Sequence, residues 1–193
     1  MQASPIKLVV GLGNPGEKYY ETRHNAGFLF LDELCREYNI TLNTEKNCFG
    51  RSAKFEHGVH TIRLLAPDTF MNLSGKSLVA AMNFYKINIE EVLVVHDELD
   101  LPVGVAKLKL SGGHGGHNGL RDIIAKTGSK DFARLRIGID HPGHASAVSG
   151  YVLKKAPKAD YQLMLDSFIS ASRVMPKLFA GEFQLAMNEL HTK

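Results

Sequence analysis

The chain shows two patterns of apolar spacing, and the first of them predicts strands. Apolar, β-branched runs mark Ile6–Leu12 and Glu91–His96 as strands that are buried on both faces. A polar turn that contains Gly58 joins two further predicted strands, Phe49–Phe55 and Val59–Leu65.

Two later strands, Val105–Leu110 and Phe132–Ile139, alternate basic residues with apolar ones. Neighbouring side chains of a strand point to opposite faces, so each of these strands is predicted to have one apolar face and one cationic face. The basic positions are Lys107, Lys109, Arg134 and Arg136.

The second pattern, with apolar residues at about the helical period, predicts helices between the strands. These helices are Asn25–Tyr38, Ser74–Tyr85 and Asn118–Thr127. A long helical region begins at Lys158, and we expect Pro176 and Gly181 to interrupt it. Because strands and helices interleave, we expect an α/β fold with three layers, in which helices cover both faces of a central mixed sheet.

The composition fits one folded domain over residues 1–193. The chain is 44% hydrophobic and 22% charged, with no internal repeat and no linker-like stretch. No apolar run approaches the about 18 residues of a membrane span, and the start of the chain lacks the pattern of a secretory signal. Cys35 and Cys48 form no CxxC pair. We therefore expect a soluble, cytoplasmic, monomeric protein.

Positive charge is concentrated in one part of the chain. Residues 101–160 hold ten Lys or Arg against four Asp or Glu, whereas the rest of the chain holds thirteen against sixteen. The modest net charge of +3 therefore conceals a basic segment of the kind that meets a polyanion. A solvated face of mixed charge is the alternative explanation.

A glycine-rich turn follows the first strand. Gly11–Gly16 fits the G-x-G-x-x-G fingerprint of dinucleotide-binding proteins. The polar and aromatic segment Glu17–Arg23 follows it, however, where the fingerprint requires a helix. Turn formation by Asn14-Pro15-Gly16 explains the same residues, and the nucleotide-cofactor interpretation stays as an alternative.

Candidate catalytic groups gather where predicted strands end. His96 and Asp97 close one strand, Asn14 follows another, and His24 precedes the first helix. A histidine, a carboxylate and neutral amides can supply a general base, the group that orients it, and hydrogen-bond donors. G-x-S-x-G is absent, so water is the expected nucleophile.

A second glycine-rich loop, Ser111–Gly119, contains His114 and His117. With His96 or His141 they would form a metal site, but the loop does not fix their spacing as a helix would. We therefore favour a role in ordering the loop through backbone hydrogen bonds. The expectation is that the protein holds no metal.

The segment Phe70–Lys76 opens a predicted helix. Asn72 or Ser74 is a candidate helix cap, and Phe70 and Met71 are candidate core residues. Exposed on the surface, Phe70 and Met71 would instead form a stacking platform for a nucleotide base.

Taken together, six motifs of the chain resemble, in the same order, those of bacterial peptidyl-tRNA hydrolases. They are Val10–Gly16, Thr22–Gly27, Phe70–Gly75, His96–Asp100, Gly112–Gly119 and Arg134–Ile139. The resemblance departs at Asp140, where a smaller residue is expected. It implies an enzyme that hydrolyses the ester between a peptide and the 3′-terminal ribose of tRNA, and so recycles tRNA, without a cofactor.

The resemblance also implies catalytic roles for four residues. His24 would activate water, and Asp97 would accept a hydrogen bond from His24 and hold its tautomer. Asn14 would bind the peptide or the 3′ end and help to recognise an acylated amino group. Asn72 would bind the substrate carbonyl and stabilise the oxyanion.

The remaining implied roles concern binding of the tRNA. Asn118 would position the water or the scissile group. Tyr19, Phe70 and Met71 would line the site for the terminal adenosine. Phosphates of the acceptor stem would lie on the cationic strands, which carry Lys107, Lys109, Arg134 and Arg136, with Arg121 nearby. A module that only binds tRNA, with His24 incidental, is the alternative, and neither interpretation requires a stable protein partner.

Overall fold

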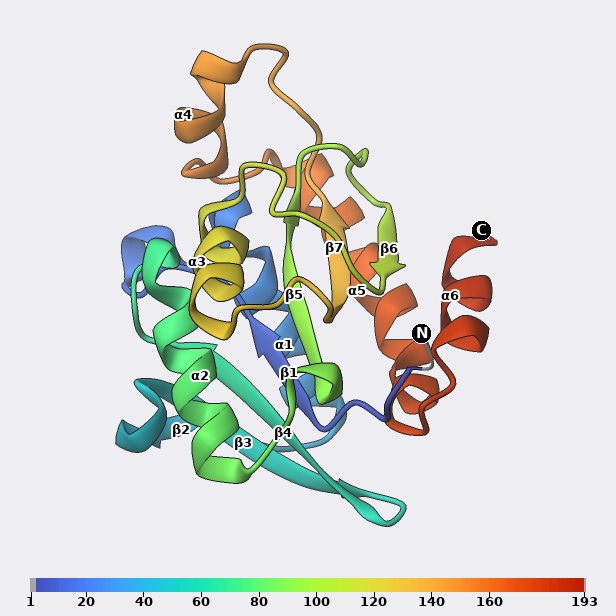
Figure 1. Cartoon of the computed structure of the whole chain (residues 1–193). Helices are drawn as coiled ribbons and strands as arrows, with labels where there is room; N and C mark the ends of the chain where they lie inside the picture. The colour runs from blue at the N-terminus through green and yellow to red at the C-terminus, as the bar shows by residue number, and fades with distance from the viewer. Residues whose placement is uncertain (1–2, 193) are drawn as a thin grey trace.

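The strands that are apolar throughout lie at the centre of a seven-stranded sheet in the computed structural model, which describes residues 3–192 (Figure 1). In order across the sheet the strands are β2 (Asn43–Glu45), β3 (Gly50–His57), β4 (His60–Pro67), β1 (Leu8–Gly11), β5 (Val92–Glu98), β7 (Ala133–Gly138) and β6 (Ala106–Lys109). The sheet is mixed, because β4, β1, β5 and β7 run parallel while β2–β3, β3–β4 and β6–β7 are antiparallel pairs.

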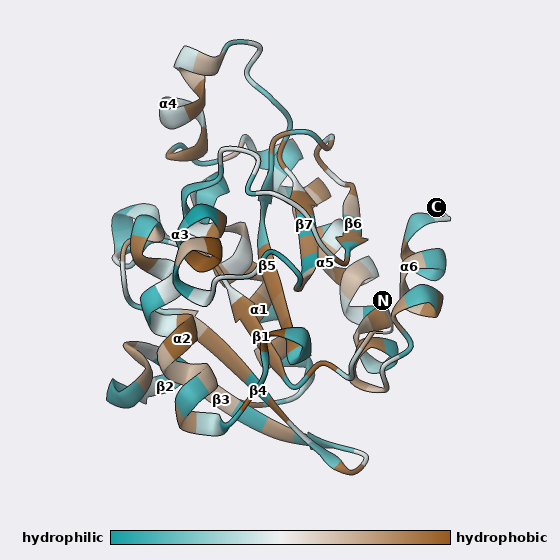
Figure 2. Cartoon of the chain, viewed as in Figure 1, coloured by the Kyte–Doolittle hydropathy of each residue, from teal (hydrophilic) through white to brown (hydrophobic). Residues whose placement is uncertain are grey.

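Helices cover both faces of this sheet, as the interleaved sequence pattern predicts. One apolar core packs α1 (Ala26–Glu37), α5 (Lys158–Phe179) and α6 (Phe183–His191) on one face, and a second core packs α2 (Ser74–Tyr85) and α3 (Asn118–Thr127) on the other. The central strands are hydrophobic, whereas the helices mix hydrophobic and hydrophilic residues (Figure 2). No helix within residues 3–192 is long and apolar enough to cross a membrane.

Two features differ from the sequence prediction. Pro176 lies inside α5 without ending it. The helix continues to Phe179, and the hydrogen bond that the missing N–H of Pro176 removes falls in the last turn. The break comes at Gly181, whose φ of 80° ends the helical path. The short strand β2 and the helix α4 (Val148–Val152) have no counterpart among the predicted elements.

The first helix approaches the sheet at a glycine. A β-carbon added to Gly27 would lie 2.3 Å from the backbone nitrogen of Leu12 and 2.5 Å from the carbonyl oxygen of Val95. A β-carbon on Gly11 would meet the carbonyl oxygen of Gly27 at 2.3 Å. The glycines after the first strand therefore permit the packing of α1, and the loop continues into a three-residue turn, Glu17–Tyr19, instead of the helix that a dinucleotide fingerprint requires.

We predict that Gly27→Ala destabilises the fold by about 1–3 kcal/mol, because the added methyl group collides with backbone that cannot move aside. Gly150→Ala is the matched control, since no atom lies within 4 Å of the added carbon. Urea unfolding followed by circular dichroism measures both. Equal unfolding midpoints for the two variants would contradict the packing explanation.

Candidate active site

The predicted catalytic residues meet where the parallel strands β1 and β5 end. Asp97 is the second-last residue of β5, and only 4% of its surface is exposed. His24 lies in the three-residue 3-10 helix η2 (Arg23–Asn25), directly before α1. The close approach of α1 to β1 and β5 places η2 beside the end of β5.

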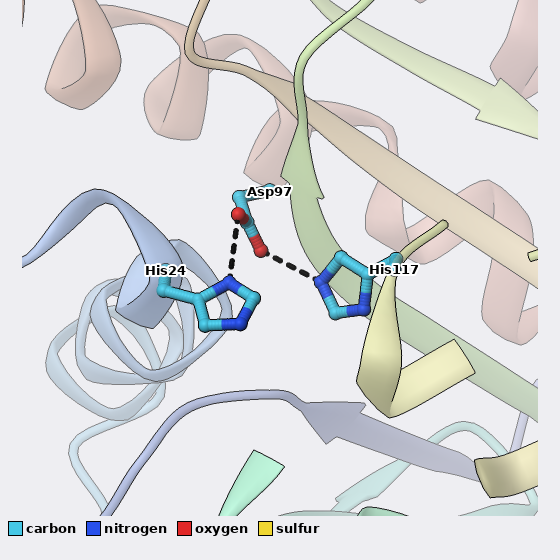
Figure 3. Close-up of side chains that lie close together, drawn as sticks. All are labelled: His24, Asp97 and His117. Carbon is cyan, nitrogen blue, oxygen red and sulfur yellow. Dashed lines mark hydrogen bonds and ion pairs between the residues drawn. The ribbon is translucent and has the colours of Figure 1, made fainter. Parts of the chain in front are cut away.

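One carboxylate joins two histidines at this point (Figure 3). Nδ1 of His24 lies 2.9 Å from Oδ2 of Asp97, and Nε2 of His117 lies 2.8 Å from Oδ1 of the same carboxylate. The two imidazole rings are 5.1 Å apart. Asp97 therefore uses both oxygens to orient a histidine on either side.

The hydrogen bonds determine the neutral tautomers of both rings. Nδ1 of His117 accepts from the backbone N–H groups of Gly119 and Leu120 at the start of α3, so its Nε2 carries the proton donated to Asp97. Because a carboxylate can only accept, Nδ1 of His24 donates to Asp97. The lone pair of neutral His24 then lies on Nε2, which no other described residue hydrogen-bonds.

The protonation states follow from burial and charge. Burial alone would raise the pKa of Asp97, but the charges and hydrogen bonds of His24 and His117 outweigh it and hold that pKa well below its usual range. For His24, burial lowers the pKa, but the charge and hydrogen bond of Asp97 dominate and raise it. Asp97 is thus an anion throughout the physiological range, and it strengthens His24 as a base.

His96, next to Asp97, has a structural part in the site. Its Nδ1 donates to the carbonyl oxygen of Asp97 at 2.7 Å, and its ring lies edge-on to His117 at 5.1 Å. Burial lowers the pKa of His96 to about 3, so the ring is neutral. Among the residues that the structure describes, neither His96 nor His141 joins a group of metal-ligating atoms. Within residues 3–192, the group that could hold an ion is His24, Asp97 and His117, whose donor atoms lie within 4.8 Å of one another.

Asn14 is held rigidly by two neighbours. Its backbone N–H donates to Oδ1 of Asn25 at 2.8 Å, and Nδ2 of Asn25 donates back to its carbonyl at 3.0 Å. Its own Oδ1 accepts from the backbone N–H of Met71 at 2.7 Å. The side-chain oxygen of Asn14 is therefore occupied, and its NH₂ group is what remains for a ligand.

An open cavity of about 1130 Å³ extends from these residues. Asn14, His24, Asn72 and Asn118 line it. The amides of Asn72, in the 3-10 helix η4 (Met71–Leu73), and Asn118, the first residue of α3, are exposed. Asn72 caps no helix, since its side chain makes no capping bond. Phe70 is 55% exposed at the rim, where Tyr19 meets it edge-on at 6.4 Å.

Met71 is a core residue, as one of its two predictions has it, and it also borders the cavity. It is 4% exposed and packs in the core beneath α2 and α3, yet part of it reaches the cavity. Phe70 is thus the exposed ring of this pair, and Met71 is its buried neighbour.

The basic residues of β6 and β7 lie opposite one another across the two strands, as predicted, but they differ in exposure. Lys107 pairs with Arg136 and Lys109 with Arg134 across the two strands. Lys109 and Arg136 line the cavity, and Arg136 also lies 3.6 Å from Glu98. Lys107 is half-buried and lies outside the cavity lining.

The prediction that Arg134 contacts phosphates is wrong. Its guanidinium is buried and donates to the backbone carbonyls of Gly112, Gly113 and Lys130. Burial lowers the pKa of Arg134 to about 10, which still leaves it charged. Arg134 therefore anchors the glycine-rich loop, and its hydrogen bonds are not available to a phosphate.

The sequence prediction missed the roles of two site residues, His117 and Asn25. His114 orders its loop as expected, because Nδ1 accepts from the N–H of Gly116 at 2.9 Å. His117 does so too, but it also donates to Asp97, and this role was missed. Asn25, fully buried against Asn14, was likewise missed. Their positions in the sequence could have indicated these roles, because His117 and Asn25 each stand at the start of a predicted helix, beside a candidate residue.

Comparisons with known proteins agree on one family. The family model described as peptidyl-tRNA hydrolase matches residues 8–193. Peptidyl-tRNA hydrolase of Pseudomonas entomophila is 55% identical over 96% of both chains, and that of Pseudomonas putida F1 is 54% identical over 97% of both.

A solved structure supports the same conclusion. The crystal structure of peptidyl-tRNA hydrolase from Acinetobacter baumannii superposes with a TM-score of 0.95 at 47% identity, covering 100% of this chain and 97% of that one. The sequence match, the shared fold and the ordered motifs all lead to one assignment. The chain belongs to the peptidyl-tRNA hydrolase family, whose members are hydrolases.

Proposed function

We propose that the chain, acting as one domain over residues 1–193, hydrolyses the ester that joins a peptide to the 3′-terminal ribose of tRNA, with water activated by His24 and without a metal. The observation that carries the proposal is the 2.9 Å hydrogen bond from Nδ1 of His24 to the buried carboxylate of Asp97. Because Nδ1 carries the proton, Nε2 keeps a free lone pair at the cavity.

The reaction then has two steps. Nε2 of His24 takes a proton from water, whose oxygen attacks the ester carbonyl carbon to give a tetrahedral oxyanion. The NH₂ group of Asn72 donates to that oxyanion, a contribution of roughly 3 kcal/mol for one such donor. As the intermediate collapses, the bond from carbon to the ribose oxygen breaks, and the protonated His24 returns its proton to that oxygen.

The remaining amides select and place the substrate. Because the oxygen of Asn14 is occupied by Met71, its NH₂ group donates to a carbonyl of the peptide or to the 3′ end. Asn118, the first residue of α3, positions the water or the scissile group. Tyr19, Phe70 and Met71 receive the terminal adenosine.

The acceptor stem lies along the cationic strands. Lys109 and Arg136 at the cavity, with Lys107 beside them, contact its phosphates without reading the base sequence. Arg121 is exposed nearby and donates to Asn118 at 3.3 Å. We further propose a monomer that works in the cytoplasm without a stable protein partner.

We predict that His24→Ala lowers the rate of ester hydrolysis by about 10²–10⁴-fold while leaving the Kd for tRNA almost unchanged, because the base is lost but the cationic strands remain. The assay measures release of labelled N-acetyl-amino acid from N-acetyl-aminoacyl-tRNA, with a chelator present. His144→Ala is the control, since His144 is exposed and outside the cavity lining. Full activity in His24→Ala would leave only the tRNA-binding module, and loss of wild-type activity with chelator would contradict a metal-free reaction.

We predict that activity falls at acidic pH with a midpoint above about 6.5, the ordinary value for histidine. Asp97 raises the pKa of His24, so the imidazole stays protonated, and inactive as a base, up to a higher pH. Asp97→Asn removes the anion while burial still lowers the pKa, so the midpoint moves down and the rate falls. Single-turnover rates against pH, with NMR titration of the imidazole, test this. An unmoved His24 titration in Asp97→Asn would contradict the assigned pairing.

We predict that Lys109→Ala and Arg136→Ala each raise KM and reduce the slope of log KM against log salt by roughly one, as expected when one phosphate contact is lost. Lys177→Ala is the control, because Lys177, on α5, pairs with Glu189 of α6 and lies outside the cavity lining. If the slope stays at its wild-type value in both cavity variants, the acceptor stem lies elsewhere.

A further inference from the structure

Arg23, the residue before His24, is buried and holds a segment from much later in the chain. Its Nη1 donates to the carbonyl oxygen of Tyr151 at 3.0 Å. Its guanidinium carbon lies 3.8 Å from the centroid of the Tyr151 ring, where the planar cation is attracted to the aromatic face. A single side chain thus contacts both the backbone and the ring of Tyr151.

Tyr151 belongs to a segment that walls the cavity. We define residues 140–155 as the capping segment, which contains α4 and projects beyond the carboxyl ends of β5 and β7 (Figure 1). The segment starts at Asp140, which has a left-handed φ of 66°. It contributes His141, Ala145, Val148, Ser149, Val152 and Leu153 to the cavity lining.

The position of the capping segment depends on its contacts with the rest of the protein. The hydroxyl of Tyr151 donates to the carbonyl oxygen of Ile139, and Val152 is buried in the core that packs α1, α5 and α6. Its helix α4 has five residues, too few for a stable helix in isolation. It returns to the body at the turn that precedes α1, where the N–H of Arg23 donates to the carbonyl of Lys154 and Thr22 forms a bridge with Lys155. The ion pair between Lys155 and Glu21 is exposed and contributes little.

The choice of arginine at this site needs a specific explanation. Arg23 is 7% exposed, and its Nε is buried without a hydrogen-bond partner in the described structure. Burying a cation with one donor unsatisfied is costly, so an apolar residue would serve better if the position required only packing. Arginine is explained if its function is to reach a carbonyl and a ring of the capping segment together.

We propose that Arg23 is a positioning residue, which fixes the capping segment as a wall of the cavity beside the base. Arg23 and His24 are consecutive in η2, so the wall and the base are attached to the same three-residue turn. Arg23 itself does not line the cavity, and it acts on the substrate only through the capping segment. The inference rests on the proposed function, because this wall matters to a substrate that reacts at His24.

Hydrogen exchange without substrate tests the attachment independently of activity. We expect Arg23→Gln to speed amide exchange in peptides covering residues 141–156 by about tenfold, the effect of a local opening that leaves the rest folded. Arg63→Gln is the matched control, since Arg63 also stacks on a tyrosine, Tyr85, at 3.9 Å but outside this cavity. Arg23→Lys keeps the charge and one donor and should restore part of the protection.

Two results of this experiment would overturn the proposal. One is unchanged exchange over residues 141–156 in Arg23→Gln. The other is faster exchange that extends equally through β5 and β7, which would make Arg23 a determinant of global stability. Since no turnover is needed, either result is informative even if the proposed hydrolysis fails.

Kinetics then separate positioning from chemistry. With N-acetyl-aminoacyl-tRNA, we expect Arg23→Gln to raise KM about fivefold to tenfold and to change the saturated single-turnover rate much less, as for a contact that binds ground and transition states alike. The midpoint of the pH profile should stay at its wild-type value, because Asp97 still pairs with His24. A shifted midpoint, or a loss confined to the saturated rate, would show that Arg23 acts on the base and not through the capping segment.

Discussion

The carboxylate of Asp97 is removed from water, and its charge has to be compensated inside the protein. The compensation comes from two histidines that lie 93 positions apart in the chain. One stands on the turn before α1 and the other at the start of α3, while the carboxylate itself ends β5. Three elements from both faces of the sheet are thus tied at one point. The glycine contact between α1 and the central strands belongs to the same constraint, because it brings that turn to the carboxylate.

The charged side of the cavity is a consequence of incomplete coverage by helices. His96, Arg136 and Lys107 form one row across β5, β7 and β6 by strand register. The core beneath α2 and α3 contains apolar residues of β1, β4 and β5, and β7 and β6 contribute basic side chains on that face. Lys107 and Arg136 stay partly exposed at this corner, whereas Arg134 and His96 are buried, and burial lowers the pKa of both. The same corner therefore carries positive charge next to the buried pair of His24 and Asp97.

Sequence reasoning worked best where local chemistry determines structure. The bounds of α2 and α3 agree with prediction, since each has a clear period, and α3 ends at Gly128, whose φ of 70° suits glycine. Sequence reasoning failed where contacts between distant parts of the chain determine the role of a residue. Alternation identified the face of Arg134 but could not reveal the loop that covers it. The second bond of His117 was hidden for the same reason, because a spacing of 20 residues does not specify that a loop folds back on Asp97.

The capping of α3 has an electrostatic consequence for the reaction centre. Nδ1 of His117 accepts hydrogen bonds from two free N–H groups at the start of that helix. Nε2 of the same ring donates a hydrogen bond to Asp97. The aligned peptide dipoles of α3 place partial positive charge at this end, and the imidazole relays that polarisation toward the carboxylate. The Asp97 anion is thus stabilised in part by the first turn of α3. The proton affinity of His24 therefore depends in part on that helix end, acting through the single ring of His117.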